Sequence, residues 1–307
     1  MELVKLRPYF SEKIWGGRGL ENFGFQLPEN KNIGEAWVIS AHPNGLSTFV
    51  NGSFANQSLA DVFENNRHLF GNFEGEFPLL VKILTPNDFL SVQVHPDDTY
   101  AQAKHNSLGK PESWYVLEAP ENAFLIYGHN AKTKNELTTL IDNKKWEQLL
   151  RKVPVKVGDF LYVAPGKIHA VTPGVVVCEI QRSSDITYRL YDYDRLDDSG
   201  QPRRLDLADS IACTTVPDSE DVIIKEGKKA IFNNDYFSVY HWNVQAEPTL
   251  VLSEKPYWLQ LTVLSGNGQI NHQNFKKGDS AITLGPIEPL QANGDLKILL
   301  SWVNKKN

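Results

Sequence analysis

Two residues whose side chains can bind a metal ion, Gln93 and His95, stand two positions apart in a segment of branched apolar residues. Side chains in a β-strand alternate between its two faces, so Gln93, His95 and the nearby Ser91 are predicted to share one face. Polar side chains on a buried strand destabilise a fold unless each has a partner, and a metal ion is one such partner. A lone histidine of this kind is more often a hydrogen-bonded core residue, so the metal interpretation needs further ligands.

Glu112 and His169 are the further ligands that the sequence offers. Glu112 begins a predicted strand after the turn Gly109-Lys110-Pro111, and His169 lies in a predicted strand after the turn Pro165-Gly166. Taken separately, Glu112 is compatible with a solvated carboxylate and His169 with a histidine at a rim. Together with the two residues above they form a donor set of two imidazoles, a carboxylate and an amide oxygen, without thiolates. Such a set suits zinc, and also iron, manganese, cobalt or nickel, which the ligand types alone do not separate.

A second polar segment, Glu179 to Arg195, is dense in arginine, aspartate and tyrosine. Its simplest interpretation is a loop that carries surface ion pairs. Guanidinium groups also bind oxyanions and developing enolates, so the same segment would suit a polar, anionic sugar.

The composition limits the partners and the compartment that the protein can have. The 307 residues carry a formal net charge of −6, whereas a nucleic-acid or anionic-membrane partner requires a basic face. The two cysteines, Cys178 and Cys213, do not make a disulfide framework, and Cys178 stands in an apolar run that predicts a buried side chain. There is no signal-peptide core and no apolar run near the ~20 residues of a membrane span. We therefore expect a cytoplasmic protein, a monomer or a homodimer, without nucleic-acid or membrane partners.

Short apolar segments separated by Gly and Pro turns fill most of the chain and favour a β-barrel or sandwich over alternating β-α-β units. Helices are predicted over residues 58–69, 98–105 and 133–150 and within 203–214, from capping residues and apolar spacing. The glycines of Trp15-Gly16-Gly17 are predicted to form a tight turn. The polar residues at about 217–230 are compatible with a link.

A short internal repeat is visible at an offset of about 120 residues. Lys156 to Asp159 is matched by Lys276 to Asp279, and Ala164 to His169 is then aligned with Leu284 to Pro289. His169 therefore corresponds to Pro289. If the repeat reflects two related barrels, the first carries the site and the second has lost it; a chance match is the alternative.

Four motifs in order and at suitable spacing make the sequence resemble the type I mannose-6-phosphate isomerase family, most closely its short bacterial branch. They are Ser91 to Pro96, Gly109 to Tyr115, Pro165 to Ala170, and Gln181 to Arg195; Trp15-Gly16-Gly17, Gly34 to Trp37 and His42-Pro43 also fit. The resemblance covers residues from about 5 to 215, and the C-terminal part matches only in kind. It implies a mainly β, cupin (jelly-roll) fold. A metal-binding barrel with short helical insertions would occupy residues 1–220, and a smaller β-barrel without a metal site residues 221–307.

The resemblance also implies roles for individual residues. Gln93, His95, Glu112 and His169 fall on the family's zinc-ligand positions, for one Zn²⁺ per chain. Arg189 falls on the catalytic arginine and Lys110 on a lysine that lines the sugar site, where it is a candidate for proton relay. Ser91 and Lys82 fall near positions that help to hold the phosphate in relatives. The interval between Leu117 and Lys156 is short, so the extra helical domain of the long members is expected to be absent or reduced.

The implied reaction interconverts mannose 6-phosphate and fructose 6-phosphate, with a proton moving between C2 and C1 through an enediolate. Two other interpretations remain open from the residues alone. One is a different metal-dependent cupin enzyme, such as an oxygenase or another sugar isomerase. The other is a barrel that binds a sugar phosphate without catalysis.

Overall fold

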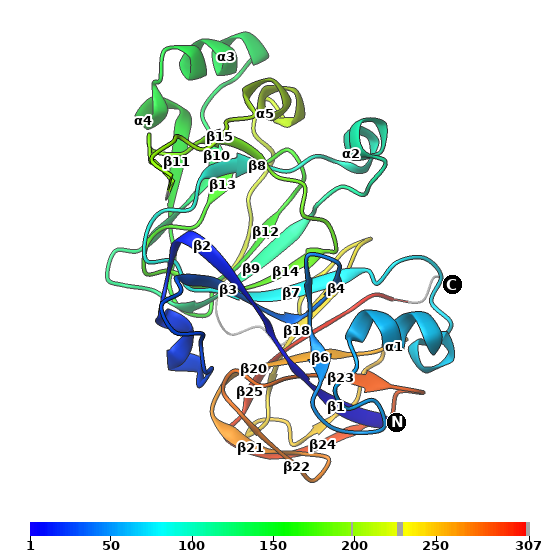
Figure 1. Cartoon of the computed structure of the whole chain (residues 1–307). Coiled ribbons are helices and arrows are strands. Elements are labelled where there is room, and N and C mark those ends of the chain that lie inside the picture. The colour runs from blue at the N-terminus through cyan, green and yellow to red at the C-terminus, as the bar shows by residue number, and fades with distance from the viewer. Residues whose placement is uncertain (198, 226–229, 305–307) are drawn as a thin grey trace.

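Two groups of β-sheets, one above the other, make up most of the molecule (Figure 1). The computed structural model describes residues 1–197, 199–225 and 230–304. Neighbouring strands within the sheets run antiparallel, as the short strands and tight turns of the sequence predict. The expectation of a mainly β protein is confirmed.

The first group contains a seven-stranded and a five-stranded sheet. The order in the larger sheet is β16 (Val222–Ile224), β12 (Phe160–Val163), β9 (Glu112–Glu118), β14 (Val176–Arg182), β7 (Leu79–Leu84), β3 (Ile33–Ile39) and β2 (Tyr9–Gly17). The order in the smaller sheet is β11 (Leu150–Pro154), β10 (Phe124–His129), β13 (His169–Ala170), β8 (Val92–Val94) and β15 (Tyr188–Tyr191).

The second group contains a seven-stranded and a four-stranded sheet. The larger sheet has the order β17 (Ala230–Asn233), β18 (Ser238–Asn243), β25 (Lys297–Trp302), β20 (Gln260–Ser265), β23 (Ser280–Leu284), β1 (Glu2–Arg7) and β6 (Thr48–Phe49). The smaller sheet has the order β19 (Thr249–Leu250), β24 (Leu290–Gly294), β21 (Asn267–Ile270) and β22 (Gln273–Lys276). Two more strands, β4 (Ala41–His42) and β5 (Gly45–Leu46), form a small hairpin.

The helices are short. They are α1 (Leu59–Asn65), α2 (Asp98–His105), α3 (Lys134–Asp142), α4 (Trp146–Leu149) and α5 (Leu207–Cys213), with 3₁₀ turns η1 (Gly19–Phe23) and η2 (Arg67–Phe70). The predicted N-caps are confirmed, because Ser58, Asp97 and Thr133 each accept a hydrogen bond from a backbone amide in the first turn. No described helix has the length and apolar character that a bilayer span requires.

Two helices end earlier than the sequence predicts. The first ends at Asn65, and the chain continues as the 3₁₀ turn η2, because Asn66 has a non-helical φ of −137°. The helix predicted over 133–150 is divided into α3 and α4, because Lys144 between them has a positive φ of 52°. Apolar spacing cannot show such interruptions, since the residues on either side still face the same core.

The outer face of the five-stranded sheet is covered by α3, α4 and α5 (Figure 1). Val92 and Val94 of β8 are fully buried in the apolar cluster that these helices complete, together with Leu137 and Ile141 of α3. Because side chains alternate along a strand, Gln93 must point to the opposite face. The helices therefore determine which face of β8 is left for polar residues.

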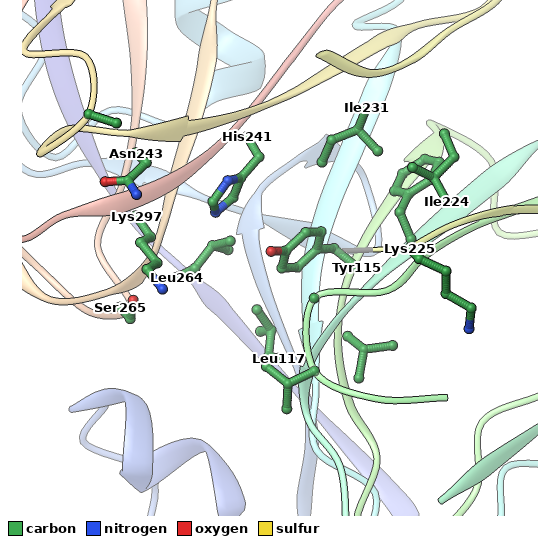
Figure 2. A pocket seen from close by; sticks show the side chains of 15 residues that line it. Tyr115, Leu117, Ile224, Lys225, Ile231, His241, Asn243, Leu264, Ser265 and Lys297 are labelled. Carbon is green, nitrogen blue, oxygen red and sulfur yellow. The ribbon is translucent and has the colours of Figure 1, made fainter. Parts of the chain in front are cut away.

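The seven-stranded sheets of the two groups pack against each other, and part of their interface is open. A cavity of about 380 Å³ lies there, with Tyr115 of β9 stacked on His241 of β18 at 5.6 Å between ring centroids (Figure 2). None of the candidate metal ligands lines this cavity.

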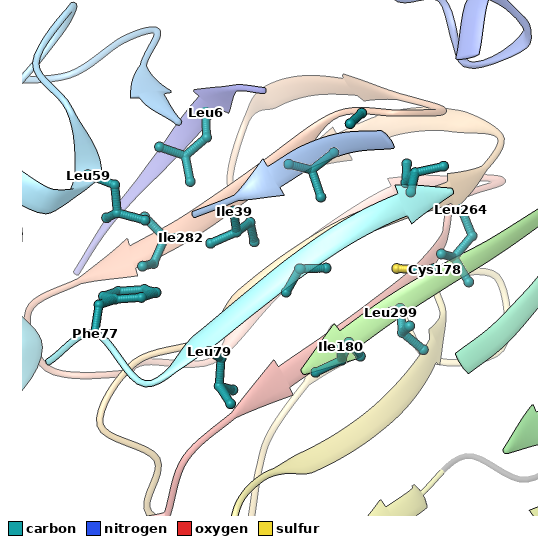
Figure 3. Packing of buried hydrophobic residues seen from close by; sticks show 14 of the residues in the cluster. Leu6, Ile39, Leu59, Phe77, Leu79, Cys178, Ile180, Leu264, Ile282 and Leu299 are labelled. Atoms are coloured by element: carbon teal, nitrogen blue, oxygen red, sulfur yellow. The ribbon is translucent and has the colours of Figure 1, made fainter. Parts of the chain in front are cut away.

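The closed part of the same interface is the largest apolar cluster among the described residues (Figure 3). Cys178 and Ile180 of β14 contribute from one sheet, and Ile282 of β23 and Leu299 of β25 from the other. Cys178 is fully buried, as predicted. One effect of the second group is thus to cover an apolar sheet face that would otherwise meet water.

The two copies of the internal repeat have the same local hydrogen bonds. In each copy a glycine with φ of 89° precedes an aspartate whose side chain accepts from the amide of the lysine three residues earlier, at 3.1 Å. Each aspartate also pairs with a lysine from the neighbouring strand segment, Lys225 with Asp159 and Lys5 with Asp279. Matching geometry at both sites supports two related sheet groups over a chance sequence match.

The register of the repeat shows how the second copy lacks ligands. Glu112 stands opposite Val163 in the first copy, and in the second Leu259 stands opposite Thr283, the counterpart of Val163. Leu259 is buried and apolar, and Pro289 replaces His169. Two ligand positions are therefore filled by residues that cannot bind a metal ion.

The prediction of a tight turn at Gly16 and Gly17 is wrong, because both residues lie in strand β2. A Cβ on Gly16 would lie 2.6 Å from the backbone nitrogen of Gly34, so the close approach of the neighbouring strand is the reason for glycine there. Within the expected link, β16 pairs with β12. The division near residue 220 stays a prediction, and β1, at the N-terminus, belongs to the second sheet group.

We predict that Gly278→Ala lowers the free energy of unfolding more than Gly285→Ala does. Both glycines have positive φ, 89° and 83°, so both substitutions carry backbone strain of about 1–3 kcal/mol. At Gly278 the new Cβ would also lie 2.3 Å from the carbonyl oxygen of Phe23, whereas nothing lies within 4 Å at Gly285. Urea unfolding of both variants measures the difference, and equal losses would contradict the contact argument.

Candidate metal centre and active site

His95, Glu112 and His169 converge in the interior of the first sheet group, and their ligand atoms all lie within 4.8 Å of one another. The two Nε2 atoms are 3.2 Å apart. Glu112 places Oε2 at 3.2 Å from Nε2 of His95 and Oε1 at 3.3 Å from Nε2 of His169. In a tetrahedral zinc site with bonds of about 2.0–2.1 Å, neighbouring ligand atoms are about 3.3 Å apart. The three side chains are therefore spaced as ligands of one ion.

Backbone carbonyls fix the orientation of both imidazole rings. Nδ1 of His95 lies 2.9 Å from the carbonyl oxygen of Ile186, and Nδ1 of His169 lies 2.8 Å from that of Lys167. A carbonyl oxygen can only accept, so each Nδ1 carries the proton and each neutral ring presents an Nε2 lone pair to the cluster. This arrangement, in which the second ring nitrogen donates to a carbonyl, is typical of metal-binding histidines.

The protonation states also suit a metal ion. Burial lowers the pKa of His169 to about 3 and lowers that of His95, so both rings are neutral at pH 7. Burial raises the pKa of Glu112, but the nearby Lys110, His95 and His169 outweigh it and hold the pKa well below its usual range. Oε1 of Glu112 is buried and has no hydrogen-bond partner among the described residues. A buried carboxylate oxygen without a partner is unfavourable, and a cation would satisfy it.

Gln93 and Lys110 complete the surroundings of this cluster. The Gln93 amide nitrogen lies 3.4 Å from Nε2 of His169, and the amide oxygen faces the cluster instead if the amide is rotated. Lys110 donates to Oε2 of Glu112 at 2.7 Å, and its ammonium lies 3.0 Å from Nε2 of His95. Gln93 can thus supply a further ligand, and Lys110 places a proton donor beside the cluster.

Strand register brings these residues together from distant parts of the sequence. His169 of β13 stands opposite Gln93 of β8, which stands opposite Arg189 of β15. Glu112 comes from β9 in the facing sheet. The predicted alternation along β8 is confirmed, because Gln93 and Ser91 line the same cavity while the valines between and beside them face the helices.

The cavity beside the cluster has a volume of about 350 Å³. Of the residues singled out from the sequence, Ser91, Gln93, Lys82, Lys110 and Arg189 line it. Its lining also includes Lys13, Glu35, Asn44, Glu179, Thr187 and Arg203, to which no role was assigned from the sequence. For two of these residues the sequence shows the same two-residue alternation that identified Gln93. Glu35 stands two positions before Trp37 on one strand, and Glu179 stands two positions before Gln181 on another.

One wall of the cavity is a row of side chains across the seven-stranded sheet. Trp114, Glu179, Lys82 and Trp37 are successive cross-strand neighbours on β9, β14, β7 and β3. Glu179 accepts from Lys82 at 3.0 Å and from the Trp114 indole at 3.0 Å. Burial lowers the pKa of Lys82, but Glu179 and Glu35 raise it further, so the pKa lies above its usual value. The charge of Lys82 is thus already matched by two carboxylates.

Arg189 differs from these lysines in its partners. Its Nη1 donates to the carbonyl oxygen of Arg204 at 2.9 Å, and its Nε is buried without a hydrogen-bond partner among the described residues. Burial lowers its pKa, and the nearby charge of Arg203 lowers it further. A partly buried guanidinium with an unused donor is suited to an anionic substrate group.

Behind His169, a fully buried lysine anchors the ligand-bearing segment. Lys167 donates to the carbonyl oxygen of Ser219 at 2.8 Å and to Asp218 at 3.2 Å, and it lies 3.1 Å from Asp221. Arg151 pairs with both aspartates. Because the carbonyl of Lys167 itself orients His169, this ion-pair network holds the backbone that positions a candidate ligand.

The fold and the site together define a cupin-type protein with a His-Glu-His cluster that can hold a metal ion. Residues 3–127 match the family described as phosphomannose isomerase type I, catalytic domain, and residues 227–303 match the mannose-6-phosphate isomerase cupin domain. The chain is 41% identical to the mannose-6-phosphate isomerase of Streptococcus mutans, over 99% of each chain. It is 43% identical to mannose-6-phosphate isomerase ManA of Bacillus subtilis, over 91% of each chain.

A solved structure gives the same result. The crystal structure of the mannose 6-phosphate isomerase from Bacillus subtilis matches with a TM-score of 0.91 and 39% sequence identity, covering 99% of this chain and 100% of that one. The chain belongs to the type I mannose-6-phosphate isomerase family, a family of aldose-ketose isomerases.

We predict that Lys167→Met lowers the free energy of unfolding by about 3–5 kcal/mol, because it leaves buried carboxylate charge at Asp218 under-compensated. Lys152→Met is the matched control: Lys152 is half-exposed and pairs with the exposed Glu147, so its loss changes stability by at most about 1 kcal/mol. Denaturant unfolding of the two variants measures both values. Equal stability of the two variants would show that the buried network contributes little.

Proposed function

We propose that the chain interconverts mannose 6-phosphate and fructose 6-phosphate through an enediolate, in the cavity beside the His-Glu-His cluster. One Zn²⁺ per chain is held by His95, Glu112 and His169, with Gln93 as a further ligand. The observation that carries the proposal is the buried cluster of two neutral imidazoles and a carboxylate with an unpartnered oxygen. Membership of the isomerase family supplies the reaction class.

When bound by His95, Glu112 and His169, zinc would supply Lewis-acid polarisation of the sugar oxygens at the reacting end. Iron, manganese, cobalt and nickel accept the same nitrogen and oxygen donors, so the choice of zinc rests on the family resemblance and on the tetrahedral spacing. The protein side chains then have to bind the sugar, stabilise negative charge and move protons.

The side chains that line the cavity divide these tasks. Arg189 donates to the oxygen that gains negative charge in the enediolate, using the guanidinium edge that the protein leaves unpaired. Lys110, beside Glu112, relays a proton to or from the sugar oxygens. Ser91 and Lys82 line the same cavity and contact the bound substrate. The protein acts on a small sugar phosphate in the cytoplasm, as a monomer or a homodimer.

The metal requirement is tested by elemental analysis together with a coupled assay that forms fructose 6-phosphate from mannose 6-phosphate. We expect about one zinc per chain, loss of isomerisation after chelation, and recovery when zinc is returned. His169→Gln should lose the metal, whereas His68→Gln, at an exposed histidine outside the cavity, should keep it. Undiminished activity of metal-free protein would contradict the proposal, and dependence on iron and oxygen would favour an oxygenase.

Arg189→Ala should reduce kcat by about 10²–10³-fold while the metal content stays unchanged, because one donor to the developing charge is lost. Arg182→Ala is the control: Arg182 lies on β14 and pairs with Asp98, outside the cavity. Steady-state kinetics and metal analysis of both variants make the comparison. Near-native kcat in Arg189→Ala would exclude the catalytic role, and sugar phosphate binding without any isomerisation by the unmodified protein would favour a non-catalytic barrel.

A further inference from the structure

The charges that line the cavity are not balanced. Five cationic side chains but only three acidic ones line it; they are Lys13, Lys82, Lys110, Arg189 and Arg203, against Glu35, Glu179 and Asp185. A phosphate monoester carries about −1.5 to −2 charges at neutral pH. The excess of positive charge matches such a group, and the position of that excess indicates where the group binds.

Each of the three lysines is already matched to a carboxylate. Lys13 lies 3.4 Å from Glu35, and Lys82 lies 3.0 Å from Glu179. Lys110 lies 2.7 Å from Glu112. Arg203 is paired with Asp192, whereas no ion pair of Arg189 is found among the described residues, so Arg189 carries the least compensated positive charge of the five.

Arg189 and Arg203 form one corner of the cavity. The two guanidinium groups are close enough for the charge of Arg203 to lower the pKa of Arg189. The loop that joins them is fixed at its end, because the backbone amide of Asp206 donates to the carbonyl oxygen of Arg189 at 2.8 Å. Asp192 and Asp206 offset these two charges in part, but Asp206 also pairs with Arg204, so an oxyanion between the two guanidinium groups would relieve their remaining repulsion.

Asp192 holds Arg203 in a fixed orientation. The carboxylate of Asp192 is buried, and it accepts from Nε of Arg203 at 2.7 Å and also from Nη2. It is shared with Arg195, whose Nη2 donates to it at 2.6 Å and whose Nη1 lies 3.2 Å from Asp88. Nη1 of Arg203 makes no hydrogen bond within the described part of the chain. The hydrogen bonds to Asp192 thus fix the orientation of the Arg203 guanidinium and leave its Nη1 edge available to a ligand.

The corner formed by Arg189 and Arg203 lies within reach of a sugar bound at the candidate metal ligands. Arg189 stands opposite Gln93, and Gln93 stands opposite His169, on successive strands. Neighbouring strands are about 4.8 Å apart, so two strand spacings separate the backbones of Arg189 and His169. A six-carbon sugar with its C1–C2 end between the metal cluster and Arg189 can place its phosphate at Arg203, in the segment that bonds to Arg189 through Asp206.

We propose that Arg203, held by Asp192, binds the phosphate group of the sugar phosphate and so provides the specificity for a phosphorylated substrate. This role rests on the proposed isomerase function, and it is separate from the charge stabilisation assigned to Arg189. Lys82, whose charge is already matched by Glu179 and Glu35, then contributes mainly to the sugar end of the site.

The test compares Arg203→Gln and Arg203→Lys with Arg195→Gln, in the metal-loaded full chain. Arg195 is the matched control, because it shares the Asp192 carboxylate but does not line the cavity. The measurements are KM and kcat for mannose 6-phosphate, the inhibition constant of inorganic phosphate, and metal content. Titration of each protein with inorganic phosphate by ³¹P NMR gives the affinity without requiring turnover.

Arg203→Gln should raise KM and the phosphate inhibition constant by about 10- to 100-fold, the range of a lost charge-assisted hydrogen bond, with a much smaller change in kcat. Arg203→Lys should recover part of the affinity, and Arg195→Gln should resemble the unmodified protein. Metal content should be the same in all variants.

Unchanged KM and phosphate affinity in Arg203→Gln would overturn the proposal, and so would an equal loss in Arg195→Gln, which would assign the effect to the Asp192 cluster as a whole. If Arg203→Gln does not fold, the same comparison is made with Arg203→Lys, whose unchanged phosphate affinity and KM would overturn the assignment of a guanidinium contact. A protein that binds phosphate through Arg203 but does not isomerise the sugar would refute the proposed function and leave this assignment standing.

Discussion

The site depends above all on the alternation of side chains along β8. Val92 and Val94 are buried against the helices on the outer face of the five-stranded sheet, so Ser91 and Gln93 must face the cavity. A slip of one residue in register would bury the polar side chains among apolar ones and expose the valines, which makes the register strongly determined. The same register fixes His169 and Arg189 on either side of Gln93.

Burial makes this arrangement chemically useful as well as demanding. The two imidazoles are kept neutral by burial, while the carboxylate of Glu112 stays ionised because the Lys110 ammonium and the neighbouring imidazoles outweigh the effect of burial on its pKa. Buried polar groups of this kind are stable only when all are satisfied, and here backbone carbonyls, Lys110 and the Lys167 network provide most of the partners. Two of the buried atoms that lack a hydrogen-bond partner in the described part of the chain, Oε1 of Glu112 and Nε of Arg189, lie where an ion and an anionic substrate would bind.

The second sheet group shows what the fold requires apart from its chemistry. Its loop geometry reproduces that of the first group, down to the Lys–Asp pair beside each glycine turn, but Leu259 and Pro289 replace two ligands. It still packs its larger sheet against the first group and buries a wide apolar face. Covering that face needs only apolar side chains of suitable shape, whereas binding a metal ion needs specific donors, so packing can persist where ligands are lost.

The sequence alone determined the short strands, the helix N-caps, the repeat, the shared face of Gln93 and Ser91, and the candidate donor set, because all of these depend on local spacing and residue type. It did not show the break at Lys144, since apolar spacing continues across it, nor that Gly16 and Gly17 lie in a strand, which depends on contact with β3.

Only the tertiary structure decided which charges are matched inside the cavity. Lys82 and Arg203 are both cations in the sequence; strand register neutralises the first with Glu179, while the loop after β15 leaves an edge of the second open to the cavity. Charge matching is a property of distances between segments far apart in the chain, and those distances are set by packing.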